Sequence, residues 1–554
     1  MTGTIIFVLL FVLMLTGMPV SISLGLTVLA FLFAMTNVPI ESVALKLFTG
    51  IERFEIMAIP FFILAGNFLT HGGVARRMIN FATSMVGHWH GGLGLAGVMA
   101  CALFAAVSGS SPATVVAIGS IILPAMVKAG FPKRFGAGVI TTSGALGILI
   151  PPSIVMVIYS VATNTSVGVL FMAGVVPGLI LASMLGALTW YRAWKNDYPR
   201  MQLFAGRTGG QATIATLAGL SASLFFIVAP IVGMWFGLRQ MEGGGLLVVL
   251  FGIVWLVIAR LLTRSAFARR WVFTVASLVA PPWLVYAISQ MFLPVSGYMV
   301  FLALLALWLI AVYPLAKKAD LMRGIGFEVR HEALQVWNAF WESVWGLLLI
   351  IVVLGGIYSG IFTPTEAAAM SAVYAFVIAV FVYKDMGLKQ VRKVLLDSAN
   401  MSAMLLYIIT NAVLFSYLLT SEQIPQMMTD WMIDKGLGAV AFLLMVNLLL
   451  LIAGNVMEPS SIVLITAPML FPVAMKLGID PVHFGILITV NMEVGLCHPP
   501  VGLNLYVASG ITKMGITELT IAVWPWLLTM LVFLVMVTYM PQMSLWLPRV
   551  LGMM

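Results

Sequence analysis

The sequence predicts an all-α polytopic membrane protein, and three observations support that fold class. Of its 554 residues, 62% are hydrophobic and 8% are charged, whereas soluble domains are about half apolar and about a quarter charged. Apolar runs at 5–15, 61–69, 246–259 and 302–312 lie in stretches close to the roughly 20 residues that a membrane-spanning helix requires. These runs are apolar on every face, whereas the strands of a membrane β-barrel alternate apolar and polar residues.

The start of the chain and its cysteines narrow the class further. No Lys or Arg precedes the first apolar run, and nothing there resembles a signal-peptide cleavage site, so we expect the first helix to be retained. Cys101 and Cys497 stand in apolar surroundings, which predicts neither a disulfide framework nor a multi-cysteine metal site.

Basic residues gather at the ends of the apolar runs. Placing these groups in the cytoplasm follows the positive-inside tendency, and one path through the membrane satisfies all of them. On this path both chain ends and residues 36–54 lie outside, and the count is about fourteen spans plus two re-entrant hairpins. The net charge of +9 then reflects topology rather than nucleic-acid binding. The basic groups lie at 76–77, 133–134, 192–200, 260–270, 317–330 and 384–393.

An internal repeat relates the two ends of the chain. Leu-Pro at 123–124 and Pro-Pro at 151–152 recur, with the same spacing, as Phe-Pro at 471–472 and Pro-Pro at 499–500. Because the first copy starts outside and the second starts inside, the copies have opposite orientation. Inverted repeats with broken helices that meet near the bilayer midplane are typical of secondary transporters. A chance match of Gly and Pro in apolar sequence is the alternative.

The repeat divides the chain into three parts. Each repeat is expected to contain one re-entrant hairpin followed by one broken helix. Between the repeats lies an inserted block of about four transmembrane helices, over residues 212–314. The parts are the first repeat at 1–200 (hairpin about 91–130, broken helix about 135–160), the inserted block at 201–331, and the second repeat at 332–554 (hairpin about 438–477, broken helix about 482–507).

In each copy a short polar segment interrupts an apolar run and is predicted to be the tip of a re-entrant hairpin. Residues 106–112 combine small residues with a proline, a composition suited to a tight turn. Residues 454–461 supply amide, carboxylate and hydroxyl oxygens in the same setting. Inside a bilayer, non-helical backbone is tolerated only where it is buried or lines a cavity.

The helices that precede the two Pro-Pro pairs are predicted to be weakened at 143–148 and 491–495, which would free backbone carbonyls. Carbonyl and hydroxyl oxygens suit a small hard cation such as Na⁺, and half-helix N-termini suit a carboxylate. At a single site, close helix packing through Gly and Ser would be the better explanation. Two sites in matching positions favour a functional interpretation.

Three acids and one histidine near these segments are candidates for function, because ionisable groups inside a membrane are usually functional. Glu366 fits a helix N-terminal cap at least as well as a transport role. Glu458 fits either a cap of the second hairpin arm or ion and gate chemistry. For Glu493 we expect a structural hydrogen bond to a loop amide, with a cavity-facing role as the alternative. His498 fits a packing role better than proton coupling, and Cys497-His498 is too little for a metal site.

Three motifs closely resemble the large membrane subunit of tripartite ATP-independent periplasmic (TRAP) transporters. They are AIPFFILAGN at 58–67, GIYSGIFTPTEA at 356–367 and NMEVGLCHPPVGLN at 491–504. The resemblance covers about 1–200 and 332–554, and the Asn-Met-Glu form of the last motif looks most like the dicarboxylate-type branch.

The resemblance implies an elevator-type fold and a Na⁺-driven importer of small organic acids, C4-dicarboxylates or related carboxylates, in the bacterial inner membrane. It implies two partners, a small four-helix membrane subunit and a periplasmic substrate-binding protein, and no cofactor beyond Na⁺ as coupling ion. The implied Na⁺ residues between hairpins and broken helices are Ser108, Gly109, Ser110, Gly144, Gly147, Asn455, Met492 and Gly495. The implied substrate residues are Ser110, Ser111, Thr114, Glu458, Ser460, Ser461, Asn491 and Asn504.

The chain departs from the family pattern in two places. Family members usually have Thr where His498 stands, which bears on ion selectivity and substrate fit. The inserted block at 212–314 stands where the family usually has a short cytoplasmic loop. It suits a scaffold extension, a docking surface for the small subunit or a diverged replacement of that subunit, and structural support is the simplest interpretation.

Other function classes are less well supported. A binding-protein-independent Na⁺/dicarboxylate symporter of related hairpin architecture is the closest alternative, and a channel is a second. An enzyme is not expected, because the chain lacks an HExxH motif, a Ser-His-Asp set at membrane depth and a GxxxxGK[ST] loop. No Arg lies within either hairpin tip to hold a carboxylate through two hydrogen bonds.

Overall fold

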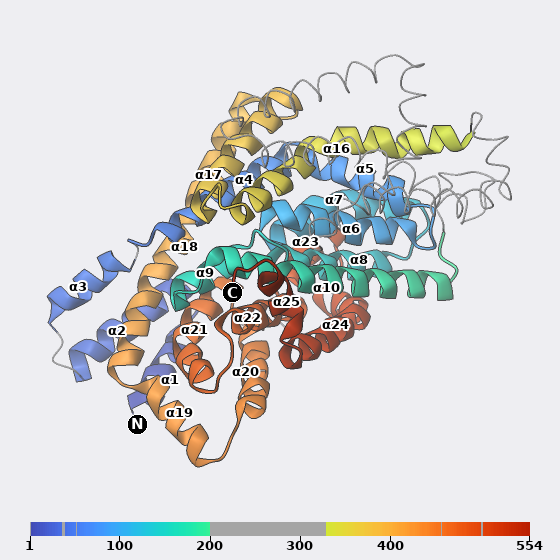
Figure 1. Cartoon of the computed structure of the whole chain (residues 1–554). Helices are drawn as coiled ribbons and strands as arrows, with labels where there is room; N and C mark the ends of the chain where they lie inside the picture. Colours follow the sequence, from blue (N-terminus) through green and yellow to red (C-terminus); the bar gives the residue numbers. More distant parts are fainter. Residues whose placement is uncertain (1, 36–38, 51, 200–327, 456, 500–501) are drawn as a thin grey trace, which may run out of the picture. The chain divides into compact units, whose positions relative to one another are not determined.

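The computed structural model describes residues 2–35, 39–50, 52–199, 328–455, 457–499 and 502–554. Every regular element in these ranges is a helix (Figure 1), as the composition predicts. The inserted block at 212–314 and its four expected spans lie outside the described residues. The described residues within 1–79, 93–199 and 345–554 form one compact unit, and those within 80–92 and 328–344 belong to a second unit.

The first unit contains both hairpins and both Pro-Pro segments. In the second unit, Phe81 and Phe340 pack edge to face with ring centroids 5.6 Å apart. The helices in chain order are α1 (Thr2–Leu15), α2 (Val20–Met35), α3 (Ile40–Thr49), η1 (Phe54–Met57), α4 (Ala58–His71), α5 (Val74–Val86), α6 (Gly92–Ser108), α7 (Ser111–Lys128), α8 (Lys133–Ser143), η2 (Gly144–Ile148), α9 (Ile154–Thr163), α10 (Val167–Lys195), α16 (Glu328–Tyr358), α17 (Pro364–Val377), η3 (Ile378–Val382), α18 (Leu388–Ser421), α19 (Ile424–Asp434), α20 (Ala439–Gly454), α21 (Pro459–Lys476), α22 (Pro481–Cys497), α23 (Leu503–Thr512), α24 (Ile516–Tyr539) and α25 (Gln542–Val550).

Eight helical stretches of the described residues are long and apolar enough to cross a membrane. Six shorter apolar helices accompany them, among them α6, α20 and α22. The protein is therefore a multi-pass helical membrane protein. The eight stretches are Phe54–His71, Ser111–Lys128, Val167–Lys195, Asn338–Tyr358, Pro364–Val382, Leu388–Ser421, Pro459–Lys476 and Ile516–Tyr539.

The first polar tip joins α6 to α7 by a turn of two residues. Gly109 has a φ of +60°, a conformation in which glycine has no side-chain penalty. Ser110 follows in extended conformation as the N-cap of α7. The next helix, α8, tightens into the 3₁₀ helix η2 and ends before Pro151-Pro152. Ser153 then caps α9, with its Oγ accepting a hydrogen bond from the Met156 amide at 3.4 Å.

The second half repeats this order with one difference. Helices α20 and α21 flank the tip at 455–458, and α22 ends shortly before Pro499. However, α22 remains α-helical through Cys497, so the predicted weakening at 491–495 is wrong. The first copy has Gly144 and Gly147 in its 3₁₀ segment, whereas the second has only Gly495, and one glycine costs a helix about 1 kcal/mol.

Each hairpin has an outer arm (α6 or α20) before its tip and an inner arm (α7 or α21) after it. The helix that follows each Pro-Pro segment contacts the inner arm of the other hairpin. Helix α9 packs on α21, and α23 packs on α7. The Tyr159 hydroxyl of α9 also donates to the Pro481 carbonyl, which lies at the start of α22, at 2.8 Å. Helices α4 and α17 also pack against each other across the two halves of the chain, as do α2 and α18. Residues far apart in sequence are thereby assembled into one core.

Candidate functional site

The tip of the first hairpin is a cluster of hydroxyls and backbone carbonyls. The Ser108 and Thr114 hydroxyls lie 2.9 Å apart, and Thr114 donates to the Ser110 carbonyl at 2.8 Å. Ser108, Ser111 and Thr114 are almost fully buried. The structure therefore brings together the predicted residues of this tip in a buried, oxygen-rich turn.

The 3₁₀ segment η2 lies directly against this tip. A Cβ atom added to Gly147 would stand 2.6 Å from the Ser110 carbonyl oxygen and 2.8 Å from the Ser111 Cα. A Cβ atom added to Gly144 would stand 2.2 Å from a methyl group of Val115. Only glycine permits this approach, so the predicted proximity of the tip and the broken helix is present in the structure.

Asn504 connects the second half of the chain to the first hairpin. Its amide nitrogen donates to the Ser111 hydroxyl at 2.7 Å and to the Thr141 carbonyl at 3.3 Å. Cys497 donates to the same carbonyl, with the sulfur 3.4 Å from the oxygen. Asn504 belongs by sequence to the second Pro-Pro motif but lies at the first tip, which the sequence motif does not reveal.

The second tip is held to α22 by a backbone contact and a side-chain pair. A Cβ atom added to Gly454 would stand 2.9 Å from the Gly495 Cα, so the two glycines let the helices touch. The His498 Nδ1 and the Asn455 Oδ1 lie 2.6 Å apart, which gives His498 a partner on the tip. This pair fixes the end of α22 against the end of α20.

Glu458 and its neighbours begin the inner arm α21. Glu458 is the N-cap residue of α21, but its side chain accepts no backbone capping bond. Its carboxylate instead accepts a hydrogen bond from the Ser461 hydroxyl at 3.1 Å. Ser461 is fully buried, and Ser460 is half-buried. Three of the predicted substrate residues are thus adjacent at one helix start.

Asn491 points to the outer arm of the second hairpin. Its amide nitrogen donates to the Asn447 Oδ1 at 2.8 Å, and Asn447 donates to the Thr538 hydroxyl at 2.8 Å. The Asn491 Oδ1 has no hydrogen-bond partner among the described residues. Met492, the next residue, is buried. Among the described residues, no hydrogen bond joins Asn491 to Glu458.

Two acids behave differently from each other. The Glu366 carboxylate accepts from the Thr363 amide at 2.8 Å, and the Thr363 hydroxyl accepts from the Glu366 amide at 3.3 Å. This reciprocal capping box favours the structural interpretation of Glu366. Glu493 is fully buried, and within the part of the chain that the structure describes neither carboxylate oxygen has a partner. The expected hydrogen bond to a loop amide is therefore wrong.

The first tip offers neutral hydroxyl and carbonyl oxygens, and the second tip adds the Glu458 carboxylate to such donors. No group of three or more His, Cys, Asp or Glu side chains that could hold a metal occurs among the described residues. Buried polar atoms without a partner in those residues include the Ser143 Oγ, beside the start of η2, and the Asn491 Oδ1. Carbonyl, hydroxyl and amide oxygens are ligands for hard cations, so the donor set fits Na⁺.

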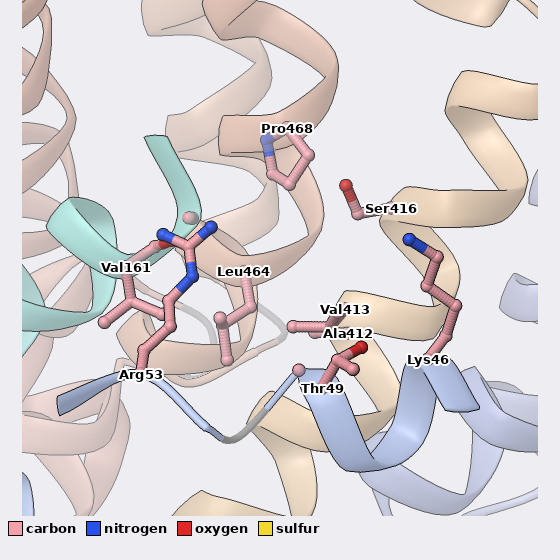
Figure 2. A pocket seen from close by; sticks show the side chains of 11 residues that line it. Lys46, Thr49, Arg53, Val161, Ala412, Val413, Ser416, Leu464 and Pro468 are labelled. Atoms are coloured by element: carbon pink, nitrogen blue, oxygen red, sulfur yellow. The ribbon is translucent and has the colours of Figure 1, made fainter. Parts of the chain in front are cut away.

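A cavity of about 210 Å³, which the sequence motifs do not predict, lies on the first unit (Figure 2). It is bounded by α3, α9, α18 and α21 and by the segment that precedes η1. Lys46 and Arg53 contribute to its wall. The available signal was that these two cations lie in the segment 36–54, which the charge path places outside, away from the other basic groups.

Comparison with known proteins shows the family to which the chain is similar. The family model described as "Tripartite ATP-independent periplasmic transporter, DctM component" matches residues 7–280 and 272–543. The chain is 59% identical to the C4-dicarboxylate TRAP transporter large permease protein of Rhodobacter capsulatus, over 100% of both chains. It is 43% identical to the protein of that name from Pseudomonas aeruginosa, over 96% of this chain and 95% of the relative.

A third relative is named for a different substrate. The isethionate TRAP transporter permease protein of Oleidesulfovibrio alaskensis is 33% identical over 96% of this chain and 64% of that protein. These relatives are named as transporter permeases, which agrees with the expectation of a transporter rather than an enzyme. Because the family model spans nearly the whole sequence and the identities extend over its full length, the chain belongs to the DctM component family of tripartite ATP-independent periplasmic transporters.

Proposed function

We propose that this chain is the large permease subunit of a Na⁺-coupled importer of C4-dicarboxylates. The observation that carries the substrate class is the 59% identity, over the whole of both chains, to a C4-dicarboxylate permease. The relatives from Rhodobacter capsulatus and Pseudomonas aeruginosa, both matched over at least 95% of their length, are named for that same class. The substrate residues of the proposal are those at the two tips together with Asn504.

Na⁺ is the proposed coupling ion at two sites. The first lies between residues 108–111 and η2, where the glycine contact excludes side chains and leaves hydroxyl and carbonyl oxygens. The second lies between Asn455 and the end of α22, near Gly495. The Ser143 Oγ, at the start of η2, lacks a partner among the described residues, which supports a cation at the first position.

The proposed mechanism is an elevator movement within an inverted-repeat architecture. The reciprocal contacts of α9 with α21 and of α23 with α7 would join both hairpins and both broken helices into one body. Helices α2, α4, α17 and α18 contact one another across the two halves and would form the scaffold. The repeats proposed at 1–200 and 332–554 supply equivalent parts to the moving body and to the scaffold. The block at 201–331 is proposed to give structural support to the scaffold.

Two partners complete the proposed assembly, a small four-helix membrane subunit and a periplasmic substrate-binding protein. The decisive test is uptake of radiolabelled succinate into proteoliposomes that contain the permease and small subunit, with and without Na⁺ and with and without the binding protein. We expect uptake only when both are present. Uptake that continues without the binding protein would instead support a binding-protein-independent symporter, and uptake that ignores Na⁺ would contradict the coupling.

A further inference from the structure

We propose that the cavity between α3, α9, α18 and α21 is a carboxylate-binding site, in which Lys46 and Arg53 together hold a small dianionic organic acid. The inference rests on the proposed function, which supplies the class of ligand. It assigns recognition of charge to residues that lie in neither hairpin tip. Figure 2 shows the Lys46 and Arg53 side chains on opposite sides of the cavity, with Leu464 and Val413 between them.

The charge of the cavity is not balanced by acids. No carboxylate is among the described residues that line it. The ion pairs found in the described ranges join Arg76 and Arg77 to Asp385 and Arg134 to Glu518, and they include neither Lys46 nor Arg53. Lys46 lies over the Tyr417 ring, with its Nζ 5.3 Å from the centroid, an orientation that leaves its charge unneutralised. Two cations without an acid favour an anionic ligand.

Arg53 is held by one edge of its guanidinium group. Its Nη1 donates to the Val161 carbonyl at 2.7 Å and to the Asn164 side-chain oxygen, both at the C-terminal end of α9. The Thr365 hydroxyl anchors the same segment by donating to the Phe54 carbonyl at 3.3 Å. The structure describes no hydrogen bond from the Nε and Nη2 atoms, and this pair of donors matches a carboxylate in two parallel hydrogen bonds.

Polar and apolar groups around the cations suit a short acid. Thr49 and Ser416 supply hydroxyls, and Ala412, Val413 and Leu464 supply an apolar surface for a short methylene chain. Drug-sized ligands occupy cavities of about 300–1,000 Å³, so the volume of about 210 Å³ fits a smaller molecule.

The cavity is also close to the second tip, because two residues of α21, the helix that begins at this tip, line the cavity. Leu464 and Pro468, which line the cavity, follow Ser461 by three and seven residues. Residues at these spacings share one face of a helix, and the rise of about 1.5 Å per residue places them roughly 5 and 10 Å along α21 from the tip. An acid bound between the cations therefore lies within one or two helical turns of the proposed substrate residues.

The test compares succinate with its monoamide, succinamate, which carries one carboxylate fewer. Equilibrium binding of both compounds is measured on the complete permease and small-subunit complex in nanodiscs of zwitterionic lipid. We expect Lys46→Gln to weaken succinate binding about tenfold or more while leaving succinamate binding nearly unchanged, because one charge-assisted hydrogen bond is lost. We expect Arg53→Lys to weaken both compounds about tenfold, because a lysine keeps the charge but not the paired donors.

The matched control is Lys128→Gln, at the exposed end of α7 and outside the cavity lining, which we expect to alter neither affinity. The inference is overturned if Lys46→Gln weakens the two compounds equally, leaves the succinate preference intact, or acts only when anionic lipid is added. These outcomes are separable from failure of the proposed function, since in that case the unmodified complex with its binding protein would not import succinate. If Arg53→Lys does not fold, Lys46→Gln alone decides.

Discussion

At the scale of single residues, Gly147 is the point at which the first hairpin tip and the 3₁₀ segment η2 touch. We predict that Gly147→Ala lowers Na⁺-dependent uptake at least tenfold, because the new Cβ would stand 2.6 Å from the Ser110 carbonyl oxygen and would push apart two backbones. The effect is measured as the Na⁺ concentration required for half-maximal uptake and as the melting temperature of the purified complex.

The control for this substitution is Gly510→Ala. Gly510 lies in α23, where an added Cβ meets no atom within 4 Å, and alanine stabilises a helix by up to about 1 kcal/mol relative to glycine. We expect the melting temperature to stay equal or rise slightly. Equal losses of uptake in both variants would show that the contact at Gly147 has no special role.

Glu493 is a second residue whose environment gives a clear expectation. Both carboxylate oxygens are buried and lack partners within the described residues, and an unpaired buried charge is costly. We predict that Glu493→Gln, which keeps the shape, preserves the melting temperature and the Na⁺ dependence of uptake. Glu493→Ala should lower stability by about 2 kcal/mol or more, because it leaves a cavity. Loss of Na⁺ dependence in the glutamine variant would instead make Glu493 an ion ligand.

At the scale of helices, the hydrogen bonds between Ser111 and Asn504 join α7 to α23. We predict that Ser111→Ala and Asn504→Ala are not additive, with a coupling of about 0.5–3 kcal/mol as for residues in contact. Melting temperatures of the two single variants and the double variant measure this coupling. An additive result would mean that the pair does not stabilise the contact between the two helices.

A control for this double-mutant comparison uses the capping box of α17. Thr363→Ala should cost about 0.5–2 kcal/mol by removing the N-cap, and Thr363 and Asn504 share no hydrogen-bond partner among the described residues. Thr363→Ala combined with Asn504→Ala should therefore be additive. Non-additivity here would indicate a general loss of stability rather than a specific pair.

At the scale of the whole molecule, the chain is a multi-pass protein of the inner membrane, and the proposed elevator movement can be tested by cross-linking. Leu464 on α21 lines the same cavity as Val413 on α18 and Val161 on α9. We predict that a cross-link between cysteines at 413 and 464 stops uptake, because it joins the proposed scaffold to the moving body. A cross-link between cysteines at 161 and 464 lies within that body and should spare uptake.

Each cross-linked protein is compared with its own reduced form, because Leu464 belongs to the proposed acid-binding cavity. The native Cys101 and Cys497 are both buried, which limits their reaction with cross-linking reagents. Inhibition by both cross-links to the same extent, or by neither, would contradict the division into scaffold and moving body.

Local sequence patterns were enough to predict the lipid surroundings, the helices and the places where the helices end. Apolar composition requires lipid, and Gly, Ser and Pro at 106–112 and 454–461 end helices because they favour turns. The helix cap at Glu366 could also be predicted from the sequence as one of its possible roles, since a capping box is a local pattern. Local patterns could not reveal that α22 stays helical through Cys497, because the geometry of a single glycine depends on its surroundings.

Which distant residues come into contact depends on how the helices pack in three dimensions. Asn504 lies on the first tip, Glu493 lacks the expected partner among the described residues, and Lys46 and Arg53 line one cavity. None of these relations is encoded at a fixed spacing, because each joins helices that are far apart in the chain. The two Pro-Pro segments mark where the helices end, and packing between the halves determines what surrounds them.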